Sequence, residues 1–135
     1  MPTILIVEDE AKMLRLLDLT LSEEGFKTFT AQDAETGLKI LRQEQIDLVI
    51  TDLKLPGMDG LEFLQAVKRG DARLPVIVMT AYGTVETAVE AMKAGASDYV
   101  LKPFSLEEMK LIVRKELDVH RLREENVSLR EALGR

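Results

Sequence analysis

The chain has 135 residues, of which 46% are hydrophobic and 31% charged, so it can bury the core of one domain and does not have the composition of a disordered protein. Its net charge of −6, without a basic cluster, argues against direct nucleic-acid binding by this chain, and the absence of cysteine excludes disulfides and thiolate metal sites. No apolar stretch is long enough for a membrane span and the N-terminus lacks the pattern of a signal peptide, so we expect a cytoplasmic protein without a membrane partner.

The first half of the chain alternates between strand-like and helix-like patterns. An apolar run at 3–8 predicts a buried strand, and apolar residues at helical spacing across 11–24 predict a helix. A short β-branched and aromatic run at 27–31 predicts a second strand. Asp33 is a candidate N-cap for a second helix at 34–44, which carries its apolar residues on one side.

The same alternation continues through the second half. The next predicted elements are a strand at 47–52, a helix at about 61–69, a strand at 76–80, a helix at 85–94 and a strand at 98–101. Ser105, with Glu108 three residues later, forms a capping-box pattern that predicts the start of a long last helix. Five apolar strands in strict alternation with helices predict an α/β fold, a parallel sheet covered by helices on both faces.

Five polar side chains stand at the carboxyl ends of the predicted strands. Glu8 and Asp9 follow the first strand, Asp52 ends the third, Thr80 ends the fourth, and Lys102 follows the fifth. Each one alone is most simply a turn or cap residue, an ordinary strand residue in the case of Thr80, or an exposed charge in the case of Lys102. Together they converge, because the carboxyl ends of parallel strands share one edge where ligands bind. Carboxylates without histidine or cysteine favour Mg²⁺, so the acid that ends the third strand is predicted to be a metal ligand, a nucleophile or both.

Four sequence strings resemble the receiver domain of two-component response regulators. They are "ILIVEDE", "DLVITDLKLPGMDG", "VIVMTAYG" and "DYVLKPF", in this order, and the resemblance covers residues 3 to about 117. It implies a flavodoxin-like (CheY-like) fold, a doubly wound five-stranded parallel sheet of strand order 2-1-3-4-5, with a receiver domain at 1–117 and an extended C-terminal helix.

The resemblance also implies how the acidic residues act. Asp52 corresponds to the phosphoacceptor, which would take a phosphoryl group from a sensor histidine kinase. Asp9, Asp52 and the backbone carbonyl of Lys54 would hold Mg²⁺, with Glu8 acting directly or through water. Many family members have two aspartates at the acidic pair, and here the first is Glu8, so its metal contact is left open.

The remaining site residues follow from the same resemblance. Thr80 corresponds to the hydroxyl that follows the phosphoryl group, and Lys102 to the lysine that pairs with it. The Lys102–Pro103 peptide is expected to be cis. Tyr99 corresponds to an aromatic switch, and the alternative is a plain core residue, since a tyrosine in a strand is usually core. Such a domain catalyses only its own phosphorylation and dephosphorylation, so we do not expect an enzyme in the ordinary sense.

The string "TAYGTVETAVEAMKAGASDYVLKPF" resembles the receivers of NtrC-like, sigma-54-dependent transcription activators, in which a coiled linker leads to an ATPase module. This chain lacks the Gly-rich phosphate loop of an ATPase. We therefore expect a fragment of a longer regulator whose output module follows Arg135, and whose full-length form binds DNA.

The end of the chain carries a heptad pattern and predicts a helical linker at 118–135. The apolar positions of the heptads, with one asparagine, are Ile112, Val119, Leu122, Asn126, Leu129 and Leu133. An asparagine at an a position fixes register and favours a parallel pair, so a coiled-coil homodimer is predicted. Since few heptads are present, a single charged helix in solvent is the alternative.

Two other functions are compatible with the strand-end acids. The first is a Mg²⁺ phosphohydrolase with an aspartyl nucleophile, which needs an acid two residues after that nucleophile, where this chain has Lys54. The second is a dimerisation module with a degenerate site. The presence of Asp9, Asp52, Thr80 and Lys102 together argues against that second function.

Overall fold

The computed structural model describes the backbone of residues 2–81 and 85–133 and the side chains of 2–81 and 85–119. Five parallel strands form one sheet in the order β2-β1-β3-β4-β5. The strands are β1 (Thr3–Val7), β2 (Lys27–Ala31), β3 (Leu48–Asp52), β4 (Val76–Thr80) and β5 (Asp98–Leu101). The helices are α1 (Ala11–Glu23), α2 (Ala34–Gln43), α3 (Gly60–Gly70), α4 (Val85–Lys93) and α5 (Leu106–Leu133). The predicted fold and strand order are confirmed, with the boundaries of the first nine elements within one residue of those expected.

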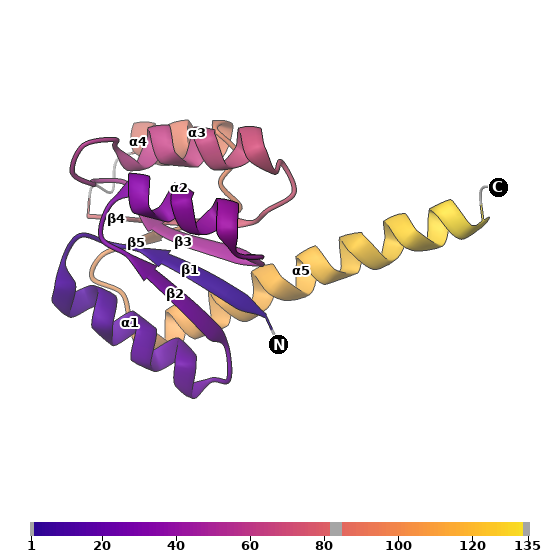
Figure 1. Ribbon diagram of the computed structural model, residues 1–135, viewed down its shortest axis with the longest axis horizontal. Helices are drawn as coiled ribbons and strands as arrows, with labels where there is room; N and C mark the ends of the chain where they lie inside the picture. Colours follow the sequence, from indigo (N-terminus) through magenta and orange to yellow (C-terminus); the bar gives the residue numbers. More distant parts are fainter. Residues whose placement is uncertain (1, 82–84, 134–135) are drawn as a thin grey trace.

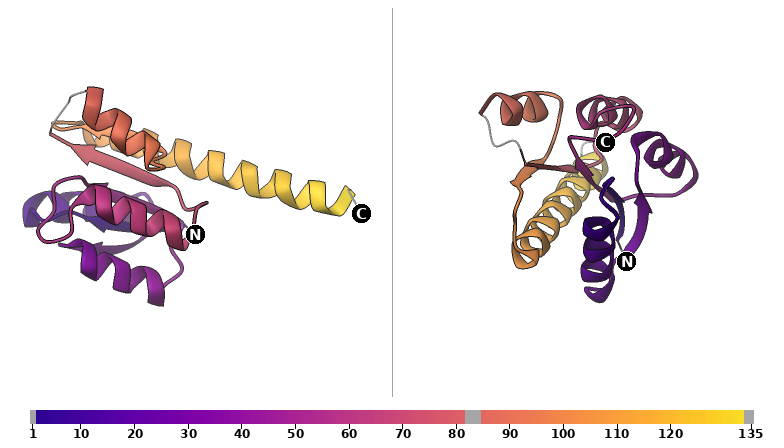
Figure 2. Two further views of the ribbon diagram at one scale, coloured as in Figure 1. Left: turned by 90° about the horizontal axis from the view of Figure 1, so that it is seen from above. Right: turned by 90° about the vertical axis from the view of Figure 1, so that its left-hand side faces the viewer.

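The helices cover both faces of the sheet (Figures 1 and 2), with α1 and α5 on one face and α2, α3 and α4 on the other. Alternate strand residues point to opposite faces, and each set packs into its own core. The α1/α5 core contains Ile4, Ile6, Leu48, Ile50, Ile77, Met79, Val100, Met109 and Val113. The α2–α4 core contains Leu5, Val7, Val49, Val76, Val78, Phe63 and Leu64. Two buried layers explain why the central strands are apolar on both faces.

Helix starts agree with the capping residues in the sequence. The Asp33 carboxylate accepts a hydrogen bond from the backbone N–H of Thr36 at 2.7 Å, as predicted. The Ser105 hydroxyl accepts one from the N–H of Glu108 at 3.0 Å, which fixes the start of α5. The position of this start matters, because α5 begins directly after the loop that carries Lys102.

Helix α5 runs along the sheet and continues well past its edge (Figure 1). Ile112 is half-buried and packs against the α1/α5 core, so the first residue of the heptad pattern contributes to the domain itself. Val119 is half-buried. The side chains of Leu122, Asn126, Leu129 and Leu133 lie outside the described residues, so coiled-coil pairing stays a prediction. Among the described residues, no helix combines the length and apolar character that a membrane span requires.

Candidate functional site at the carboxyl edge of the sheet

The predicted site residues meet where the strands end. Asp52 is the last residue of β3, the central strand, which pairs with β1 on one side and β4 on the other. Glu8 and Asp9 follow β1, Thr80 ends β4, and Lys102 follows β5. A strand at the centre of a parallel sheet therefore ends on a carboxylate because its last residue opens onto the shared edge.

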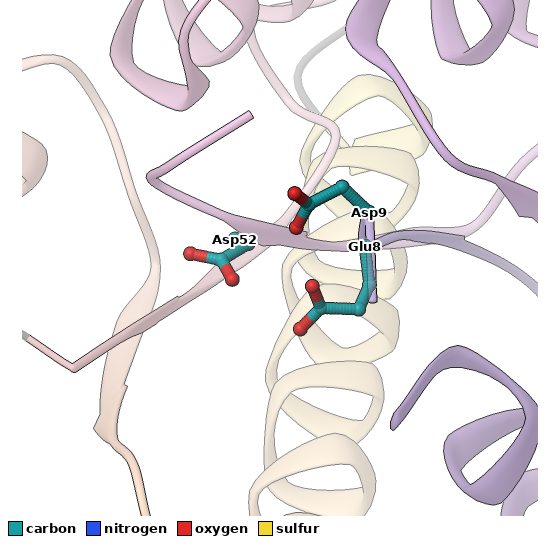
Figure 3. Close-up of side chains that lie close together, drawn as sticks. All are labelled: Glu8, Asp9 and Asp52. Carbon is teal, nitrogen blue, oxygen red and sulfur yellow. The ribbon is translucent and has the colours of Figure 1, made fainter. Parts of the chain in front are cut away.

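Three carboxylates converge at this edge (Figure 3). Glu8, Asp9 and Asp52 each offer an oxygen, and these oxygens lie within 4.8 Å of one another. Glu8 and Asp52 are buried, whereas Asp9 is exposed. Like charges this close repel, so the arrangement requires cations nearby.

Lys102 supplies one such cation. Its Nζ lies 2.6 Å from Oε1 of Glu8 and 2.6 Å from Oδ2 of Asp52, so one ammonium bridges two carboxylates. The backbone N–H of Lys102 donates to the carbonyl of Thr80 at 2.8 Å, which fixes the β5–α5 loop against the end of β4. The Lys102–Pro103 peptide is cis, the isomer that the resemblance implied.

The pKa values of Glu8 and Lys102 reflect competition between burial and the opposite charges beside each group. Burial raises the pKa of Glu8 above its ordinary value, although the hydrogen bonds from Lys102 and the Glu10 N–H oppose the rise. Burial alone would lower the pKa of Lys102, but the hydrogen bonds to Asp52 and Glu8 outweigh it and raise that pKa. The ammonium of Lys102 is therefore held in its charged form.

The loop after β3 fixes the orientation of the Asp52 carboxylate. The backbone N–H of Lys54 donates to Oδ1 of Asp52 at 3.0 Å, while Oδ2 faces Lys102. Lys54, whose carbonyl was predicted as a metal ligand, thus belongs to the loop directly next to the carboxylates.

The two predicted switch residues, Thr80 and Tyr99, lie on the face of the sheet that α2, α3 and α4 cover. Thr80 is 1% exposed, and Tyr99 is half-buried. Tyr99 pairs with Val78, which packs in the α2–α4 core, so Tyr99 emerges on the same face as Val78 and Thr80. This common face places both residues beside α4 rather than α5.

Gly60 is a site residue that sequence reasoning did not identify. A Cβ added there would lie 2.2 Å from the carbonyl oxygen of Asp52 and 2.3 Å from Cα of Leu53. The N–H of Gly60 also donates to the carbonyl of Leu53 at 2.8 Å. The helix was predicted to begin at about residue 61, so position 60 was left outside it. A glycine that opens a helix directly after the N-cap Asp59 is a signal of close backbone approach.

The donor set fits a hard dication. Three carboxylates against the one ammonium of Lys102 leave two uncompensated negative charges among these four groups. All the candidate ligands are oxygens, which suits Mg²⁺ or a similar ion.

Comparisons with known proteins agree with this geometry. The family model for the response regulator receiver domain matches residues 4–114. Regulatory protein AtoC of Escherichia coli is 42% identical over 97% of this chain, which spans only 28% of the length of AtoC. Sporulation initiation phosphotransferase F of Bacillus subtilis is 40% identical over 84% of this chain and 92% of its own length. Among solved structures, NtrX from Brucella abortus matches with a TM-score of 0.90 and 36% identity over 95% of this chain and 30% of its own. A CheY-like receiver domain protein from Methanospirillum hungatei matches with a TM-score of 0.88 and 29% identity, over 91% of this chain and 98% of its own.

Proposed function

This chain belongs to the response regulator receiver domain family, and on that premise we propose that Asp52 accepts a phosphoryl group from a sensor histidine kinase. The observation that carries the proposal is the bridge of Lys102 to Asp52 and Glu8, with Asp9 beside them. In this cluster the central carboxylate of Asp52 contacts the ammonium of Lys102. The acidic pair beside it, Glu8 and Asp9, could hold a second cation.

Mg²⁺ is the proposed cofactor. Asp9, Asp52 and the backbone carbonyl of Lys54 would hold it, with Glu8 close by. When bound, it would neutralise charge that develops on the phosphoryl oxygens.

The chain's own residues have distinct proposed roles in the transfer. An Asp52 carboxylate oxygen attacks phosphorus, the bond from phosphorus to the kinase histidine nitrogen breaks, and that nitrogen keeps the electron pair. Lys102 then pairs with a phosphoryl oxygen in place of the free carboxylate. The Thr80 hydroxyl turns toward the phosphoryl group, and Tyr99, on the same face, moves with it as a switch. The only reactions proposed for the domain are phosphorylation of Asp52 and hydrolysis of the aspartyl phosphate, in which water attacks phosphorus and the Asp52 carboxylate leaves.

The output of this switch is proposed to be a transcription activator. In this proposal residues 1–117 are the receiver, and residues 118–135 are the linker to a module that acts on DNA in the full-length protein. The continuous helix α5 supports this division, since it leads from the Lys102 loop to beyond the sheet. A change at the site would reach the linker through the base of that helix.

Phosphoacceptor identity is tested by intact mass after incubation with Mg²⁺ and acetyl phosphate. Wild type should gain the mass of one phosphoryl group, and Asp52→Asn should gain none. Asp59→Asn is the matched control, because Asp59 caps α3 in the same loop region and asparagine also caps helices well. An equal gain in wild type and Asp52→Asn would exclude Asp52 as the acceptor.

The proposed homodimer is tested at Asn126. Replacing a polar a-position residue by leucine strengthens coiled coils but relaxes their register. We therefore expect Asn126→Leu to associate more tightly than wild type in sedimentation, and beryllofluoride with Mg²⁺ to change the association or shape of wild type. Beryllofluoride that occupies Asp52 without altering either would argue against coupling between site and linker.

A further inference from the structure

The loop between β3 and α3, residues 53–59, is held at both ends. At its start the backbone N–H of Lys54 donates to Oδ1 of Asp52 at 3.0 Å. At its end the carboxylate of Asp59 accepts the N–H of Glu62 at 2.8 Å and so caps α3. The conformation of this loop matters for the proposed site, because the Lys54 carbonyl is one of the proposed metal ligands.

The middle of the loop is exposed and turns at a glycine. Gly57 has a φ of +72°, in the left-handed region that glycine adopts readily. Pro56 and Gly57 are exposed, whereas Leu55 is buried. Burial fixes the Leu55 side chain but not the orientation of the peptide groups on either side of it. A contact from outside the loop would therefore select one conformation of the turn.

Glu35 supplies such a contact from α2. Helices α2 and α3 lie on the same face of the sheet (Figure 1), and Glu35 is in the first turn of α2. Its Oε1 accepts the backbone N–H of Met58 at 3.3 Å. A Cβ added at Gly57 would lie 3.2 Å from the same oxygen, and the three atoms nearest to it would all belong to the Glu35 carboxylate group. This carboxylate thus lies against the turn itself.

We propose that Glu35 is a positioning residue for the site. It fixes the turn at residues 56–58 and, through this short loop, the orientation of the Lys54 backbone beside Asp52. The carboxylates that converge at the edge of the sheet are those of Glu8, Asp9 and Asp52, so Glu35 acts through the loop and not as a ligand. The assignment rests on the proposed function, since it concerns the same site.

The first test compares amide hydrogen exchange in the full 135-residue protein without Mg²⁺. In Glu35→Ala the N–H groups of Met58 and Lys54 should exchange about fivefold faster than in wild type, because the hydrogen bond that fixes the turn is lost. Glu35→Gln should keep the slow exchange, since an amide oxygen accepts the same hydrogen bond. Glu62→Ala is the matched control, because Glu62 is also an exposed acid in the first turn of a helix. Its exchange at both positions should equal that of wild type.

Calorimetry with Mg²⁺ on the same four proteins separates the position of the loop from net charge. The buffer contains about 0.15 M salt, which screens exposed charges beyond ~8 Å. Glu35→Ala should lower Mg²⁺ affinity by about threefold to fivefold. Glu35→Gln and Glu62→Ala each remove one negative charge as well, yet should bind Mg²⁺ nearly as wild type does. An equal loss of affinity in all three variants would overturn the proposal, and so would wild-type exchange of the Lys54 N–H in Glu35→Ala.

Intact mass after incubation with Mg²⁺ and acetyl phosphate separates this proposal from the proposed function. If wild type gains a phosphoryl group while exchange and Mg²⁺ affinity are unchanged in Glu35→Ala, only the role of Glu35 is rejected. If wild type gains none, the proposed function is rejected. The exchange comparison, which needs no Mg²⁺, then still decides whether Glu35 fixes the loop.

Discussion

Two charge clusters in this domain have opposite arrangements at their centres. At the carboxyl edge of the sheet, one cation, Lys102, lies between two carboxylates. Between α1 and α5, one carboxylate, Glu24, lies between two cations, with Lys110 at 3.3 Å and Arg114 at 2.6 Å. The first cluster belongs to the proposed site, and the second joins two helices on the surface.

Burial separates the behaviour of the two clusters. Glu8 is 1% exposed, whereas Glu24 is 23% exposed and its partner Arg114 is 52% exposed. Burial raises the pKa of Glu8, while hydrogen bonds from Lys110 and Arg114 lower the pKa of Glu24. The surface carboxylate is thus satisfied by its partners and contributes little to stability. The edge retains uncompensated negative charge, which suits a site that receives a metal and a phosphoryl group.

The largest effect on stability is expected at Gly60, where α3 approaches the backbone at the end of β3. Gly60→Ala should destabilise the domain by about 3 kcal/mol or more, because its Cβ would overlap backbone atoms of Asp52 and Leu53 that cannot turn aside. Gly70→Ala, at the other end of α3, is the matched control, since an added Cβ there meets nothing within 4 Å. The Gly70→Ala variant should gain about 0.5–1 kcal/mol in its free energy of unfolding. Urea unfolding measures both. A Gly60→Ala variant as stable as wild type would contradict the close approach beneath Asp52.

A smaller effect is expected from removing the cation of the buried cluster. Lys102→Met leaves Glu8 and Asp52 without their shared partner, and should cost about 2 kcal/mol in Mg²⁺-free buffer. This is below the cost for a fully buried pair, because the Lys102 side chain keeps 18% exposure. Lys110→Met removes a surface cation that pairs with Glu24 and Glu107, and should have a much smaller effect. Equal losses for the two variants in urea unfolding would mean that burial does not distinguish the clusters.

The sequence predicted those features that depend on local pattern and on topology. The alternation of apolar strands and amphipathic helices was sufficient for a parallel sheet covered on both faces, whereas the strand order was predicted from the resemblance to receiver domains. The rule that parallel strands share a carboxyl edge was sufficient to bring Glu8, Asp9, Asp52 and Lys102 together. Neither argument needs to know where any side chain points.

The features that escaped prediction depend on exact distances between distant residues. The contact of Lys102 with Glu8 joins residues 94 positions apart and depends on the reach of both side chains across β3 and β4. The need for glycine at position 60 depends on how closely α3 approaches the end of β3. The link from Glu24 to Arg114 spans 90 positions between two exposed helix surfaces, where apolar patterning gives no signal.

The smallest effect is on the pH dependence of stability, to which Glu8 and Glu24 should contribute with opposite sign. Glu8 has a folded-state pKa above its ordinary value of 4.5, so the stabilisation it gives is complete below that value and is lost as pH rises through the raised pKa. Glu24 has a folded-state pKa below 4.5, so its stabilisation is present above that value and is lost as pH falls through the lowered pKa. The cations that face them, Lys102 and Lys110, have raised pKa values and stay charged throughout the acidic and neutral pH range.

In Mg²⁺-free urea unfolding from about pH 3 to pH 8, the stability of wild type minus that of Glu8→Gln should fall with rising pH. The corresponding difference for Glu24→Gln should rise. A difference for Glu8→Gln that rises with pH, as expected for Glu24→Gln, would show that burial does not set the sign of the shift at Glu8.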